Sequence, residues 1–90
     1  MHIQIFNLDL NLIEADLQRL FTPYGELNDV QIARDQWNNR SKGKATINMP
    51  VEKEALNAIT RLNGALLGTK HIVVTGTTFE EEQTIKSLID

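Results

Sequence analysis

The chain contains no cysteine among its 90 residues, so disulfide bonds and thiolate metal sites are excluded. This composition fits a reducing compartment, and we expect a cytoplasmic protein. No run of about 18 apolar residues is present that could span a membrane. The apolar stretch at residues 2–6 is too short and too mixed for the core of a signal peptide.

Residue groupings typical of catalytic or metal sites are also missing from the sequence. His2 and His71 are isolated, and no carboxylate pair or Ser/His arrangement has a spacing that a solvated surface would not explain. We therefore expect a protein that is not an enzyme and that needs no metal or other cofactor.

Charged residues are distributed unevenly along the chain. The formal net charge is −3, but residues 1–78 carry eight basic and eight acidic side chains and are therefore neutral. The whole excess of −3 falls in residues 79–90, whereas residues 34–44 hold a local excess of +3. We expect one folded domain over residues 1–78, followed by an acidic tail or short helix over residues 79–90.

The most informative stretch is residues 40–49, in which small or apolar side chains alternate with polar ones. The first set is Gly43, Ala45, Ile47 and Met49, and the second is Lys42, Lys44, Thr46 and Asn48. Side chains in a strand point alternately to its two faces, so this pattern predicts a half-buried strand.

The same alternation predicts three further strands, over residues 2–8, 27–33 and 70–75. A polar turn at residues 36–39 is expected to join the second strand to the strand at residues 40–49 as a hairpin. In the last strand, Ile72 and Val74 should face inward.

Apolar residues at three- and four-residue spacing predict two helices. The first stripe is Ile13, Leu17, Leu20 and Phe21, and the second is Val51, Ala55, Ala58, Ile59 and Leu62. A capping-box pattern from Asn11 to Glu14 should start the first helix, and Pro50 should start the second. Gly25 and Gly64 are expected to end them.

This order of strand, helix, strand, strand, helix, strand predicts an α+β sandwich of the ferredoxin-like type, βαββαβ. Four antiparallel strands should form one sheet, with both helices on one of its faces. Many proteins with unrelated functions share this order, so it does not by itself indicate a function.

Two of the strands narrow the choice, because their sequences resemble the two motifs of the RNA recognition motif (RRM) family. Residues 42–49 resemble the octamer motif and residues 3–8 the hexamer motif. The inward positions resemble both motifs, with Met49 as an apolar stand-in for the last aromatic residue of the octamer. The outward positions with which family members stack bases hold Gln4, Lys44 and Thr46 instead of aromatic residues. The chain thus resembles a single-domain RRM with degenerate stacking positions.

The resemblance covers about residues 2–77 and implies single-stranded RNA bound across the outward face of the sheet. The candidate RNA-binding residues are Gln4, Phe6, Arg34, Trp37, Arg40, Lys42, Lys44, Thr46 and His71. Phe6 is expected to stack on a base. Binding to phosphates is expected from Arg40, Lys42 and Lys44. Trp37 could stack a base from the hairpin turn, fold back on the hairpin, or lie in an interface with a partner.

Missing aromatic residues should make RNA binding weak or of low specificity. Stacking of one base on an aromatic ring contributes roughly 1–3 kcal/mol, so losing two such platforms costs about 2–6 kcal/mol. Lysine restores part of that affinity electrostatically, without sequence preference and with strong salt dependence. The alternative is a protein–protein interaction module that has the RRM fold and has lost RNA binding.

Residues 79–90 combine acidic residues with an apolar stripe. Glu80, Glu81 and Glu82 precede Ile85, Leu88 and Ile89, a spacing that predicts a short third helix. Such a short helix is stable only when its stripe docks on something. Three roles are open: a solubilising end, a cover over the outward sheet face, and a docking segment for another protein or a second copy.

Overall fold

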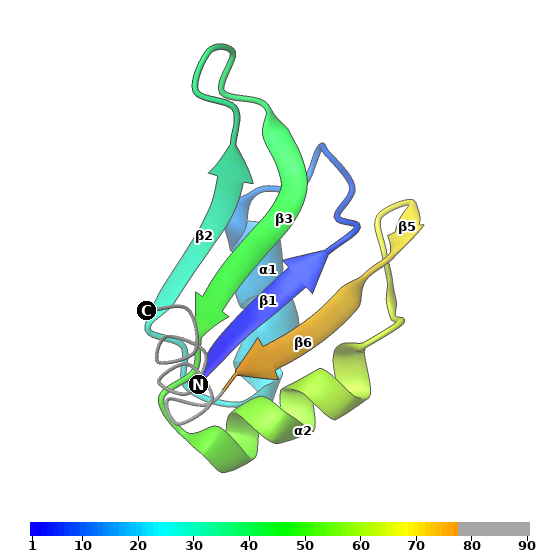
Figure 1. Ribbon diagram of the computed structural model, residues 1–90. Coiled ribbons are helices and arrows are strands. Elements are labelled where there is room, and N and C mark those ends of the chain that lie inside the picture. The colour runs from blue at the N-terminus through cyan, green and yellow to red at the C-terminus, as the bar shows by residue number, and fades with distance from the viewer. Residues whose placement is uncertain (78–90) are drawn as a thin grey trace, which may run out of the picture.

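The computed structural model describes residues 1–77, which form a four-stranded sheet backed by two helices, together with a separate two-stranded hairpin (Figure 1). Its elements in chain order are β1 (His2–Phe6), α1 (Glu14–Phe21), the 3-10 turn η1 (Thr22–Tyr24), β2 (Asp29–Arg34), β3 (Ser41–Asn48), α2 (Glu52–Leu62), β4 (Leu66–Leu67), β5 (Lys70–His71) and β6 (Val73–Thr77). The predicted tail or third helix at residues 79–90 lies outside the described residues.

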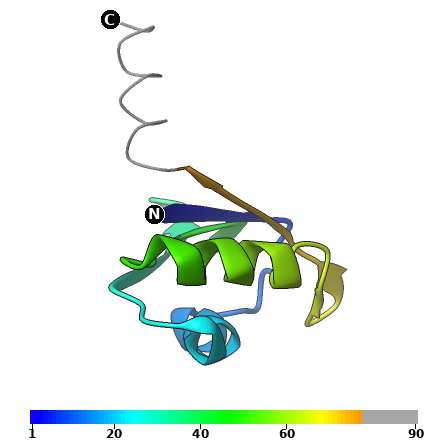
Figure 2. The ribbon, with the colours of Figure 1, turned by 90° about the horizontal axis from the view of Figure 1, so that it is seen from below.

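The main sheet has the strand order β2-β3-β1-β6, and every neighbouring pair is antiparallel. Both helices lie against one face of this sheet, and no element of residues 1–77 covers the other face, which is called the open face below (Figure 2). This arrangement confirms the predicted ferredoxin-like α+β fold.

The hydrophobic core fills the space between the sheet and the helices. Ile3 and Ile5 of β1 are completely buried, as is Ile72 just before β6. The helices contribute apolar residues that meet them: Leu17, Phe21, Ala55, Ala58 and Leu62. The alternation in the strands and the helical spacing therefore predicted the core correctly at most positions.

The first helix begins differently from the predicted capping box. The Asp9 carboxylate accepts the backbone N–H of Asn11 at 3.0 Å, which holds Asn11 in a turn before the helix. The actual N-cap is Ile13, whose N–H donates to the Asp16 carboxylate at 2.9 Å. Ile13 is consequently 52% exposed and does not belong to the apolar stripe.

The second helix also begins later in the chain than predicted. Val51 is its N-cap, so Pro50 precedes the cap instead of occupying the first helical turn. Val51 is 42% exposed and does not belong to the buried stripe. At the other end, the Asn63 side chain accepts the N–H of Val74 at 3.0 Å and ties the end of the helix to β6. Gly64 follows with φ 85°, as predicted for a residue that ends a helix.

The predicted last strand at residues 70–75 is divided into two. β5 pairs with β4 in a separate two-stranded hairpin, in which Leu66 lies opposite His71. The backbone of Ile72 bonds to Gly64 and Ala65 instead of the main sheet. β6 begins only at Val73, so alternation correctly predicted the buried faces of Ile72 and Val74 but not the change of pairing partner.

Candidate nucleic-acid interface

The open face of the sheet is organised in rows of side chains that cross the strands. In the central row, Gln4 of β1 lies opposite both Thr46 of β3 and Thr75 of β6, and Thr46 lies opposite Gln31 of β2. All four residues are exposed. Their amides and hydroxyls can each donate and accept hydrogen bonds. The row that would stack bases in the family therefore forms a surface suited to hydrogen bonding.

The next row toward the hairpin combines apolar surface with a cation. Phe6 lies opposite Lys44 on one side and Val73 on the other. Phe6 is 36% exposed and Val73 is 44% exposed, so the ring is available to a ligand. A hollow of about 280 Å³ adjoins this row; its lining is Gln4, Phe6, Gln31, Ile32, Ala33, Lys44, Ala45 and Thr46. Of the predicted site residues, Gln4, Phe6, Lys44 and Thr46 thus come together.

The third row lies at the opposite end of β1. Asn48 of β3 is opposite both His2 and Asp29. A second hollow of about 290 Å³ is lined by His2, Gln4, Asp29, Thr46, Ile47 and Asn48. Asp29 is not among the site residues predicted from the sequence. Its position opposite Asn48 depends on strand register, which the hydrophobic pattern of β2 alone does not reveal.

A bulge in β3 shapes the base of the hairpin. The register between β2 and β3 shifts between Ile32 and Arg34, and Gly43 has φ 76°. The Gly43 carbonyl accepts a hydrogen bond from the N–H of Leu8 at 3.0 Å. The N–H of Gly43 donates to the Ser41 hydroxyl at 3.1 Å. Glycine adopts this φ without steric cost, so the strand can bend here while Lys44 stays on the open face.

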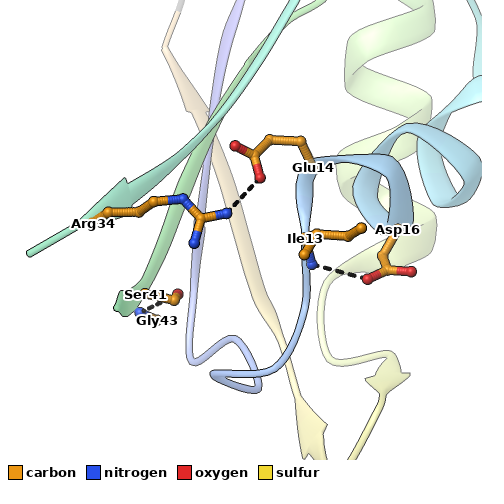
Figure 3. A network of polar contacts seen from close by, with 6 residues as sticks. All are labelled: Ile13, Glu14, Asp16, Arg34, Ser41 and Gly43. Atoms are coloured by element: carbon orange, nitrogen blue, oxygen red, sulfur yellow. Dashed lines mark hydrogen bonds and ion pairs between the residues drawn. The ribbon is translucent and has the colours of Figure 1, made fainter. Parts of the chain in front are cut away.

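Arg34 lies apart from the other hairpin cations. Its guanidinium donates to the Glu14 carboxylate at 2.7 Å, across the space between β2 and the start of α1 (Figure 3). This hydrogen bond is the main reason why the pKa of Glu14 lies below its usual value. Arg34 is two residues from the buried Ile32 in β2, and residues two apart in a strand point to the same face. This alternation could have shown from the sequence that the Arg34 side chain points inward. Arg40 and Lys42 are exposed on the hairpin.

The hairpin turn is held by side-chain contacts to its own backbone. Asp35 Oδ1 accepts the N–H groups of Trp37 at 2.8 Å and Asn38 at 3.3 Å, and Asn38 Oδ1 accepts the N–H of Arg40 at 3.0 Å. Asn39 has φ 57°, a left-handed conformation that asparagine tolerates better than most residues. Trp37 is 87% exposed, so its ring does not fold back on the hairpin. Base stacking and a partner interface are the two roles left for it.

His71 lies away from the three rows. It belongs to β5, and its Nδ1 is 2.9 Å from the carbonyl oxygen of Gly64. The Asn7 side chain donates to the His71 carbonyl at 2.8 Å. The contact with Asn7 holds the β4–β5 hairpin beside the end of β1, and the pairing of β5 with β4 places this predicted site residue outside the main sheet.

Residues 1–77 contain no group of three or more His, Asp or Glu side chains placed to hold a metal ion. No helix in the same range is long and apolar enough to cross a membrane.

The described residues thus form a small α+β domain of the βαββαβ type, with exposed polar, aromatic and cationic side chains on the sheet face opposite the helices. The sequence matches the family model described as RNA recognition motif over residues 3–73. The chain therefore belongs to the RNA recognition motif family, as its two motifs predicted.

Known proteins agree with this assignment. The chain is 36% identical over 74 residues to the cytotoxic granule-associated RNA binding protein tiar-1 of Caenorhabditis elegans, and the match covers 79% of this chain and 18% of that protein. It is 33% identical over 73 residues to a probable arginine/serine-rich splicing factor of the same organism, covering 81% of this chain and 37% of that protein. The chain thus spans well under half the length of these two relatives.

Two solved structures share the fold. The crystal structure of RNA binding protein PG1 has a TM-score of 0.83 and 27% identity, covering 86% of this chain and 93% of that one. A structure titled Sxl-lethal protein/RNA complex has a TM-score of 0.78 and 25% identity, covering 82% of this chain and 46% of that one.

Proposed function

We propose that this domain binds single-stranded RNA on its open sheet face and on the exposed cations of the β2–β3 hairpin. The observation that carries the proposal is the row in which Phe6 lies between Lys44 and Val73, beside a hollow of about 280 Å³. An exposed ring next to a lysine can stack a base and attract its phosphate. Membership of the RRM family and the likeness to a protein/RNA complex support the same function.

The proposed affinity is low and depends strongly on salt. Gln4, Lys44 and Thr46 offer no aromatic platform, and each missing platform removes roughly 1–3 kcal/mol of stacking. Arg40, Lys42 and Lys44 supply electrostatic attraction to phosphates, which weakens as salt rises. Trp37 supplies a further ring at the hairpin turn.

Fluorescence anisotropy of labelled single-stranded RNA pools tests this function. Lys42→Ala/Lys44→Ala should weaken binding and lower the slope of log K against log salt by about 1.4, because each phosphate contact to a single strand contributes about 0.7. Lys53→Ala/Arg61→Ala is the matched control, since it removes two exposed cations from α2. Equal losses in both variants, or no binding by the wild type at low salt, would contradict the proposal.

A second function, docking of another protein, is favoured by a separate surface on the helix side of the hairpin. Leu10 is 59% exposed and Ile13 is 52% exposed. Both line a hollow of about 580 Å³ together with Arg34 and Arg40. Leu10→Ser/Ile13→Ser should abolish capture of such a partner while RNA affinity stays unchanged; a loss of RNA affinity would assign the surface to RNA instead.

A further inference from the structure

The second hollow of the open face contains an acidic group that a general phosphate-binding surface does not need. Asp29 is the first residue of β2, is exposed, and lies opposite Asn48. Within residues 1–77, no hydrogen bond or ion pair occupies its carboxylate. A free carboxylate repels phosphate and accepts hydrogen bonds, so this hollow is suited to the donor edge of a base.

The second hollow adjoins the hollow beside the Phe6 row. Gln4 and Thr46 line both hollows and form the wall between them. Side chains two residues apart on one face are separated by about 7 Å along a strand, so the Asp29 row lies roughly 14 Å from the Phe6 row. A strand of RNA with one base stacked on Phe6 can therefore place a later base over Asp29.

The chemistry of the hollow distinguishes guanine from the other three bases. The Watson–Crick edge of guanine presents two adjacent donors, N1–H and the N2 amino group, followed by the O6 acceptor. Cytosine and adenine present one amino donor beside a ring nitrogen acceptor, and uracil presents one N–H between two carbonyls. Only guanine can donate twice to one carboxylate without turning an acceptor toward it.

The Asn48 amide can supply the donor that the O6 atom of guanine requires. It lies opposite Asp29 and lines the same hollow. An amide NH2 can donate to the O6 atom of a guanine whose N1–H and N2 groups face the carboxylate. We propose that the second hollow is a guanine-selective subsite of the open face, with Asp29 accepting from guanine N1–H and N2–H and Asn48 donating to O6. This assignment rests on the proposed binding of RNA to the same face.

The test uses labelled oligouridine and oligouridine carrying one guanosine at successive positions, measured by fluorescence anisotropy at low salt. The wild type should bind the best single-guanosine RNA about tenfold more tightly than oligouridine, the range expected for a good bidentate pair. Asp29→Asn keeps the shape of the side chain and should abolish this preference without weakening binding to oligouridine. Inosine, which lacks the N2 amino group, should lose most of the preference in the wild type.

Glu52→Gln is the matched control, because it removes one exposed carboxylate from the first turn of α2 and should keep the guanine preference. Binding of RNA without a guanine preference, or a preference that survives in Asp29→Asn, would overturn the subsite while leaving RNA binding in place. Absence of binding to every RNA at low salt would overturn the proposed function and the subsite together.

Discussion

The two faces of the four-stranded sheet differ in how closely they follow the motifs of the family. The inner face carries fully buried residues such as Ile3, which fits the hexamer motif, and Ile47, which fits the octamer motif. The outer face carries Gln4, Lys44 and Thr46 at the three positions where the motifs have stacking aromatic residues. Neighbouring residues in a strand point to opposite faces, so separate residues encode the fold and the binding surface. One set can change while the other is kept.

Substitutions on the inner side of the sheet should cause the largest losses of stability. Phe21 is completely buried against the sheet, and Phe21→Ala should lower the free energy of unfolding by about 3–5 kcal/mol through lost burial and a residual cavity. Urea denaturation followed by circular dichroism measures this change. The control is Val73→Ala, on the outer face, where the side chain is 44% exposed and the loss should stay below about 1 kcal/mol. Similar losses in the two variants would contradict the division between faces.

The outer face should gain affinity when an aromatic platform is restored. Thr46→Phe places a ring beside Gln4 in the central row, and it should tighten RNA binding by about 1–3 kcal/mol. Anisotropy titrations measure the gain, and urea denaturation checks that stability is little changed. Thr60→Phe makes the same substitution on the exposed side of α2 and should leave affinity unaltered. If Thr46→Phe brings no gain, RNA does not cross the central row.

The ion pair between Arg34 and Glu14 joins the inner side of β2 to α1 and predicts a small effect of pH. Because its pKa is lowered in the folded protein, Glu14 stabilises the fold above its unfolded pKa of about 4.3, and this contribution is lost as pH falls through the folded value. The pair is partly solvated, so Glu14→Gln should cost less than about 1 kcal/mol at pH 7.

Urea denaturation of wild type and Glu14→Gln should therefore show a difference at pH 7 that shrinks as the pH falls below the ordinary pKa of glutamate and through the lowered pKa of the folded protein. Glu52→Gln on α2 serves as the control for loss of one exposed carboxylate. A difference that grows toward low pH would contradict this sign.

The smallest predicted effect concerns the acidic residues 79–90. Deleting them removes a charge of −3 and leaves the buried core within residues 3–74 complete. Affinity for RNA should rise severalfold at low salt and change little at high salt, because the repulsion involved is screened. Anisotropy at two salt concentrations measures this effect. A gain that persists at high salt would indicate instead that the segment covers the open face by apolar contacts.

The sequence predicted those features that depend on local periodicity. Alternation in β1 and β3 predicted the sheet, its buried face and its outer face, because a buried strand face requires period two. The predicted starts of both helices were wrong. The Asp9 carboxylate accepts a hydrogen bond from the backbone N–H of Asn11 in a turn before α1, and Val51 is the N-cap of α2. Contacts between distant residues were also missed, among them the hydrogen bond from Arg34 to Glu14.

The candidate site shows the same limit. Gln4, Phe6, Lys44 and Thr46 were predicted together because two recognisable motifs hold them. The neighbouring Asp29 belongs to no motif, and only the register of β2 against β3 brings it opposite Asn48. His71 was assigned to the sheet face because residues 70–75 alternate without a break, and alternation does not reveal that β5 pairs with β4 and not with β1.

An NMR titration of the isotope-labelled chain with single-stranded RNA at low salt tests directly whether RNA binds to the open sheet face. Backbone amide shifts should concentrate on β1, β3 and the hairpin, with the largest changes near Phe6, Lys44 and Thr46, while α1 and α2 stay unaffected. Shifts confined to the helices, or none at RNA concentrations up to the millimolar range, would show that the open sheet face is not an RNA-binding surface.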